Sequence, residues 1–215
     1  MKRLRRHSIG RIPGYAAILI LAGVTAVAAA GDDGTAPPKA HMRIANPADL
    51  SGARAESVYQ GIRAALARSY GESGDPVTAA YQGWRRYNLV PYRSSRHGGV
   101  FVNNYANERA AAYGRFGGQG PMPVGAVIVK DSFVVTRRGD VMTGPLHLME
   151  KKAPGFDPAN DDWLYMSLAA DGRLVGVSGG LGAENVTFCA ECHARAPAAS
   201  DHLFFMPRDV RRPSR

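Results

Sequence analysis

The sequence predicts an α+β protein, in which a mainly antiparallel β-sheet with peripheral helices follows an N-terminal helical segment. From residue 93 onward, short runs of apolar and β-branched residues alternate with turn residues, which is typical of antiparallel strands. Before that point, apolar residues recur at helical spacing between residues 46 and 92. A four-helix bundle is excluded, because it needs helical periodicity sustained through the second half of the chain.

Residues 1–30 have the composition of a secretory signal peptide. Residues 1–14 contain five basic residues and no acidic one, and the apolar run that follows ends in Ala28-Ala29-Ala30. An uncleaved membrane anchor is the alternative, but the run is short for a full span. We therefore expect cleavage and export to a bacterial periplasm. Residues 31–45 are rich in Gly, Asp, Pro and Ala and are predicted to be a linker.

The net charge of +9 does not indicate a nucleic-acid-binding protein. Five positive charges lie in the signal peptide, and residues 206–215 contain four arginines against one aspartate. The remaining chain is near neutral, so no nucleic-acid partner is expected. Residues 208–215 are predicted to be a solvated, frayed basic tail, with a docking patch for an acidic partner as the weaker alternative.

Two helices are expected between residues 46 and 92. Asn46 is the predicted N-cap of the first, which continues to a left-handed cap at Gly71. Asp75-Pro76 repeats this start signal for a second helix that extends to about Tyr87. The two helices should form a hairpin that packs on the sheet.

The region after residue 93 divides into candidate strands, one short helix and turns. The alternation over residues 163–169 should place Trp163, Tyr165 and Ser167 on one face of a strand and the intervening residues on the other. The dipeptide Asp171-Gly172 predicts a two-residue hairpin turn before a returning strand. The remaining expected elements are a strand at 100–102, a helix at 104–113, a loop at 117–123, strands at 124–129 and 132–136, shorter strands within 141–149, and the returning strand at 174–177.

Cys189, Cys192 and His193 form a Cys-x-x-Cys-His motif, the attachment signature of a c-type haem. Each thiol can add across a vinyl group of the haem, and the adjacent histidine is the proximal ligand of the iron. The chain has only these two cysteines, so one haem per chain is expected. A disulfide loop or half of a zinc site is the alternative, although a structural zinc ion needs four ligands.

Residues 93–207 resemble the cytochrome P-460 family, which includes the β-sheet cytochromes c′ (c′-beta). The resemblance is carried by His97-Gly98 with the strand after it, by residues 122–130 ending in Lys130, and by Trp163 with the Asp-Gly hairpin. It also includes a C-terminal Cys-x-x-Cys-His followed by Asp201 and Phe204. The spacing Pro-x-Gly-x-x-x-x-Lys is the most discriminating of these elements.

The resemblance implies a β-rich, often dimeric periplasmic haem protein with His193 as the proximal ligand and an open distal side. In the enzymatic members, a lysine at the position of Lys130 is covalently linked to the haem, and the protein oxidises hydroxylamine and passes electrons to a periplasmic partner. In the c′-beta members this link is absent and the haem binds nitric oxide. Without the resemblance, Lys130 beside Asp131 would be interpreted as a solvent-facing turn lysine.

Other residues leave alternatives open. No carboxylate lies between His193 and Asp201, so a proton acceptor for hydroxylamine oxidation is not evident, and Arg195 is the only charged residue in that interval. His97, in a Gly turn, is expected to be structural or solvated, with proximity to the haem as the alternative. Iron ligation is less expected for His147 and His202. A simple electron carrier would need a sixth ligand, for which the candidate methionines are Met122, Met142, Met149, Met166 and Met206.

Overall fold

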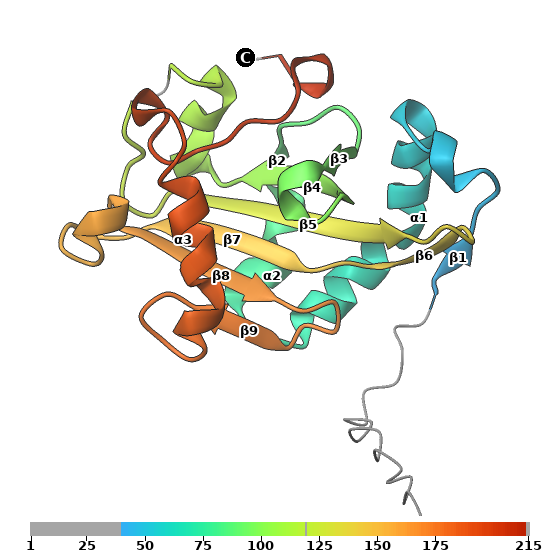
Figure 1. Ribbon diagram of the computed structural model, residues 1–215, viewed down its shortest axis with the longest axis horizontal. Helices are drawn as coiled ribbons and strands as arrows, with labels where there is room; N and C mark the ends of the chain where they lie inside the picture. Colours follow the sequence, from blue (N-terminus) through green and yellow to red (C-terminus); the bar gives the residue numbers. More distant parts are fainter. Residues whose placement is uncertain (1–39, 119, 214–215) are drawn as a thin grey trace, which may run out of the picture. The chain divides into compact units, whose positions relative to one another are not determined.

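The sheet is organised around one long strand, β5 (Val127–Val135), which pairs along both of its edges. The structure is a computed structural model that describes residues 40–118 and 120–213 (Figure 1). One edge of β5 pairs with β4 (Val100–Ala106), and the other pairs with β6 (Asp140–Thr143) and β7 (Leu146–Lys151). All these pairings are antiparallel, so the predicted α+β fold with a mainly antiparallel sheet is confirmed.

The remaining strands extend the sheet on both sides. β8 (Trp163–Leu168) and β9 (Leu174–Val177) continue it beyond β7, and β1 (Met42–Arg43) pairs with β6. β2 (Arg85–Arg86) and β3 (Tyr92–Ser94) both pair with β4. Residues 42–43, expected in the linker, are therefore part of the sheet.

The β8–β9 hairpin is confirmed, but its loop has three residues rather than two. The amide of Ala169 donates to the carbonyl of Arg173, and Gly172 has a φ of 86°. This is the pattern of a three-residue hairpin loop that ends in a left-handed residue.

Two predicted elements around β4 and β5 are wrong. The runs 124–129 and 132–136 are one continuous strand, so Lys130 lies in mid-strand and not at a turn. Similarly, β4 continues to Ala106, so the helix expected at 104–113 begins later, as a 3-10 helix (Glu108–Arg115) capped by Asn107. The Asn107 side chain accepts the amide hydrogen of Ala110 at 3.0 Å. Apolar run lengths alone did not reveal that polar residues continue both strands.

The N-terminal helices also differ from expectation at their ends. Helix α1 (Gly52–Gly71) begins after a separate 3-10 turn (Pro47–Asp49), and Glu72 continues in right-handed conformation, so the left-handed cap predicted at Gly71 is wrong. Helix α2 (Pro76–Ala80) is capped by Asp75 as predicted but ends before Tyr87, because the chain turns into β2.

Each face of the sheet has its own core. Helix α1 packs on one face, where Tyr59, Ile62 and Leu66 join Val129 and Phe133 of β5. The predicted alternation of β8 is confirmed, since Leu164, Met166 and Leu168 pack with the α1 cluster whereas Trp163 and Tyr165 pack on the opposite face. That opposite face carries helix α3 (Thr187–His193), which crosses the sheet in Figure 1.

Residues 208–213, the described part of the predicted basic tail, are bound to the fold and are not frayed as predicted. Val210 and Arg212 form backbone hydrogen bonds with Leu89 and Tyr87, both at 2.8 Å. The predicted signal peptide, residues 1–30, lies outside the described residues. Among the residues that are described, no helix is both long and apolar enough to span a bilayer.

Gly176 in β9 is expected to resist substitution. A Cβ atom there would overlap the carbonyl oxygen of Gly182, so Gly176→Ala should lower the free energy of unfolding by about 1–3 kcal/mol. Gly71, at the end of α1, has open space around its Cα, and Gly71→Ala should instead raise it by about 0.4–1 kcal/mol. Urea unfolding of both variants checks this, and equal midpoints would contradict it.

Candidate functional site

Helix α3 carries the Cys-x-x-Cys-His motif and presents both thiols to one cavity. Cys189 and Cys192 are three residues apart, so they project from the same side of the helix. Both are unpaired and half-buried, and both border a cavity of about 320 Å³ between α3 and the sheet, called the α3 cavity below. His193 borders the same cavity. The structure therefore brings the three motif residues together.

The ring of His193 is fixed in orientation and in tautomer. Its Nδ1 donates to the carbonyl oxygen of His202 at 2.7 Å, which leaves Nε2 as the nitrogen with a free lone pair. The ring lies 5.5 Å from the rings of both Tyr165 and Phe204. Burial lowers the pKa of His193 to about 4, so the imidazole is neutral at pH 7, as a metal ligand must be.

Lys130 borders the α3 cavity from the sheet side. It lies at the centre of β5, between Asn104 of β4 and His147 of β7, and its Nζ is 3.4 Å from Nε2 of His97. Burial, and then the charge of Arg96, lower the pKa of Lys130 to about 8. The turn-lysine interpretation is therefore wrong, because this amine is held in a cavity without an ion pair among the described residues.

Two histidines lie beside Lys130. His97 and His147 both border the α3 cavity, and their ring centroids are 5.3 Å apart. The Nδ1 atom of His97 is 2.8 Å from the hydroxyl of Ser94, and the Nδ1 atom of His147 is 3.2 Å from the hydroxyl of Ser167. Burial and the charge of Lys130 lower the pKa of His97 to about 2 and of His147 to about 4. Both are neutral bases at pH 7, and His97 is not the solvated turn residue that its Gly context favours.

Arg96 was missed by the sequence reasoning. Its guanidinium lies 4.1 Å from the ring centroid of Phe204, and both side chains border the α3 cavity. Arg195, the candidate from the sequence, is exposed and outside the cavity lining. Arg96 stands in a short 3-10 turn (Ser95–His97), and its position next to His97 was the only signal that could have found it.

The other candidates separate into cavity and non-cavity residues. Met149 and Met166 border the α3 cavity, whereas Met122, Met142 and Met206 do not. His202 contributes its carbonyl to His193, as described above. Asp201 does not border the α3 cavity. Its carboxylate pairs with Lys151 at 2.7 Å, and its backbone carbonyl accepts a hydrogen bond from the indole of Trp163 at 3.1 Å.

The residues present fit a c-type haem better than the alternatives. A haem of this type needs two thiols, one imidazole with a free nitrogen and apolar walls, and the α3 cavity offers all of these. Across residues 40–118 and 120–213, no group of three or more His, Cys, Asp or Glu residues is placed to hold a metal ion directly, which counts against a structural zinc site. The thiols are also not joined in a disulfide.

The fold and site define an antiparallel-sheet protein with a Cys-x-x-Cys-His helix closing a buried cavity. No protein-family model matches the chain, and no curated protein matches it significantly. The resemblance to the cytochrome P-460 family therefore depends on the residues quoted above.

Proposed function

We propose that the protein is an exported mono-haem c-type cytochrome that oxidises small nitrogen compounds such as hydroxylamine. The observation that carries this proposal is that Lys130 borders the same cavity as Cys189, Cys192 and His193. Lys130 is far from the other three residues in the chain, and the resemblance to the cytochrome P-460 family assigns all four of them to the haem. Export rests on residues 1–30, and the electrons would pass to a periplasmic electron-transfer partner. A homodimer is part of the same proposal.

Each of these residues would have a separate role toward the haem. Cys189 and Cys192 would form the thioether bonds, and Nε2 of His193 would bind the iron. When bound, the haem would supply an iron that binds the nitrogen compound and takes up its electrons. Lys130 would add a third covalent bond to the macrocycle. Its pKa of about 8 favours this, because only the neutral amine has a lone pair for bond formation.

Protons released on oxidation would be taken up by histidines. Among the described residues, no carboxylate borders the α3 cavity, and Arg96 is permanently charged. His97 and His147 are the neutral bases that border this cavity. Each contacts a serine hydroxyl through Nδ1, so its Nε2 points away from that serine. Because burial and the charge of Lys130 lower their pKa values to about 2 and about 4, they would pass protons onward to water rather than hold them, in place of the carboxylate found in some family members.

A second candidate function is non-enzymatic binding of nitric oxide, as in the c′-beta proteins. The lack of a carboxylate in the described cavity lining favours it, as do the apolar walls formed by Ile128, Leu203 and Phe204. Such surroundings suit a small neutral diatomic molecule. A simple electron carrier remains the third candidate, with Met149 as a sixth ligand, because Met149 packs on the same face of the sheet as the cavity.

Optical spectra of the oxidised and reduced protein separate these functions. The enzymatic proposal predicts a broad, strongly red-shifted Soret band that Lys130→Ala converts to that of an ordinary c-type haem, with loss of hydroxylamine oxidation. Lys152→Ala is the matched control, because Lys152 pairs with Glu150 at 3.1 Å and does not border the cavity. An ordinary five-coordinate high-spin spectrum in the unsubstituted protein would favour nitric oxide binding, and a six-coordinate low-spin spectrum would favour electron transfer.

A further inference from the structure

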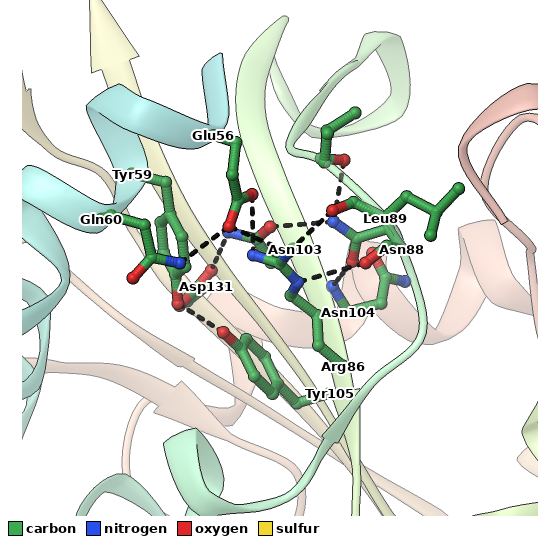
Figure 2. A network of polar contacts seen from close by, with 11 residues as sticks. Glu56, Tyr59, Gln60, Arg86, Asn88, Leu89, Asn103, Asn104, Tyr105 and Asp131 are labelled. Atoms are coloured by element: carbon green, nitrogen blue, oxygen red, sulfur yellow. Dashed lines mark hydrogen bonds and ion pairs between the residues drawn. The ribbon is translucent and has the colours of Figure 1, made fainter. Parts of the chain in front are cut away.

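A carboxylate is buried on the α1 face of the sheet, opposite the α3 cavity. Asp131 is fully buried, and its Oδ2 accepts hydrogen bonds from the hydroxyls of Tyr59 at 2.9 Å and Tyr81 at 3.2 Å. Its Oδ1 accepts from the side-chain amide of Asn103 at 3.0 Å. Figure 2 shows Asp131 with Tyr59 and Asn103, between α1 and strands β4 and β5.

No described lysine or arginine forms an ion pair with Asp131. The guanidinium of Arg86, whose charge acts on Asp131, pairs instead with Glu56 at 3.0 Å and lies 5.6 Å from the ring centroid of Tyr59. The carboxylate is therefore held by neutral donors only. Burial raises the pKa of Asp131 to about 6, so at pH 7 it is ionised and is a stronger proton acceptor than an ordinary carboxylate.

Tyr59 is the phenol best placed to lose a proton to Asp131. Because Tyr59 donates to Oδ2 of Asp131, its oxygen is left to accept, and Tyr105 donates to it at 2.5 Å. If Tyr59 lost its hydrogen, the proton would move along an existing hydrogen bond, and Tyr105 would still donate to the oxygen left behind. Burial, and then the charge of Asp131, raise the pKa of Tyr59 far above its ordinary range, so the phenol remains protonated until it is oxidised.

Strand β5 connects this cluster to the α3 cavity. Lys130 and Asp131 are consecutive, so their side chains lie on opposite faces of one strand, and Lys130 borders the cavity. The route from Tyr59 to the cavity consists of one hydrogen bond and then the covalent chain of Asp131 and Lys130.

We propose that Tyr59 is a redox-active tyrosine that gives an electron to the α3 cavity across β5 while its proton passes to Asp131. The O–H bond of Tyr59 breaks, the proton binds Oδ2 of Asp131, and the phenol becomes a neutral phenoxyl radical. The electron would pass to a one-electron acceptor in the cavity, which would be the haem held there by Cys189, Cys192 and His193 after hydrogen peroxide has oxidised it. The cation over the ring disfavours a phenol radical cation, so electron and proton leave together. This inference rests on the proposed haem function for its natural oxidant.

Electron paramagnetic resonance tests the inference in two arms, both on the full chain with haem attached. In the first arm, flash-oxidised tris(bipyridyl)ruthenium supplies a one-electron oxidant that does not depend on the haem. In the second, hydrogen peroxide is added and the sample is frozen. Ring-deuterated tyrosine identifies a tyrosyl signal by its narrowing. We expect a tyrosyl radical in both arms that is lost in Tyr59→Phe and in Asp131→Asn.

Tyr70→Phe is the matched control. Tyr70 is equally buried under α1 but donates only to the backbone carbonyls of Ser132 and Gly144, so this variant should keep the signal. A radical in the first arm that depends on Tyr59, with a silent peroxide arm in protein that carries haem, would show an oxidisable tyrosine that does not donate to the cavity and would overturn the inference. The proposed haem function is judged separately, by the haem content and optical spectra of the same sample. A first arm without a tyrosyl radical, or with one that persists in Tyr59→Phe, would overturn the inference.

Discussion

The double variant Cys189→Ala, Cys192→Ala is expected to carry no covalently bound haem. The two thiols are the only ones in the chain, and both border the α3 cavity, so no other pair of thioether bonds can form. Lys130 should not replace them, because the thioether bonds would be what positions the ring for Lys130 to reach it. The loss should be complete on a denaturing gel stained for haem peroxidase activity.

Glu191→Gln provides the matched control for the cysteine variants. Glu191 lies between the two cysteines on α3, is exposed, and does not border the cavity. Its replacement should leave the staining at the level of the unsubstituted protein. Persistent staining in the double cysteine variant would show that the haem is attached elsewhere.

The second large expected effect is the pH dependence that Asp131 gives to the free energy of unfolding. Its pKa is raised from 3.8 to about 6 in the folded protein, so the folded state holds the proton more tightly than the unfolded state does. The stabilisation from this proton is fully present below about pH 4 and is lost as the pH rises through about 6; for such a shift it amounts to about 3 kcal/mol.

Asp131→Asn isolates this contribution, because asparagine does not titrate and the other carboxylates cancel in the comparison. The unsubstituted protein should gain about 2 kcal/mol in its free energy of unfolding relative to the variant between pH 7 and pH 4, with the rest gained below pH 4. Urea unfolding at the two pH values measures the difference. If the difference between the two proteins is the same at both pH values, the buried carboxylate is not titrating as described.

Local sequence patterns were sufficient to predict the fold class and the motif residues on the α3 side of the cavity. The alternation of β8 and the Asp171-Gly172 turn identified a hairpin correctly, and the motif placed both thiols and an imidazole on one side of α3. These features depend on neighbours within a few residues, where the periods of helix and strand are decisive. The N-cap at Asp75 was found for the same reason.

The rest of the site depends on pairings that are remote in the sequence. Lys130 enters the cavity because β5 runs unbroken through Lys130 and Asp131, and both charged residues had suggested a turn. Both residues can be buried because their side chains lie on opposite faces of the strand. The amine of Lys130 borders the α3 cavity, and the carboxylate of Asp131 accepts hydrogen bonds from Tyr59 and Tyr81. Neither environment is visible in the residues next to them.

Mass spectrometry of the protein, produced together with a c-type haem maturation system, tests the central claim most directly. Trypsin should release the peptide from Leu174 to Arg195 with the mass of one haem added at Cys189 and Cys192. If Lys130 is also bound, the peptide from Phe116 to Arg137 should be joined to the same species. Recovery of the Leu174–Arg195 peptide with free thiols or a disulfide, under conditions in which other c-type cytochromes are matured, would contradict the assignment of this cavity to haem.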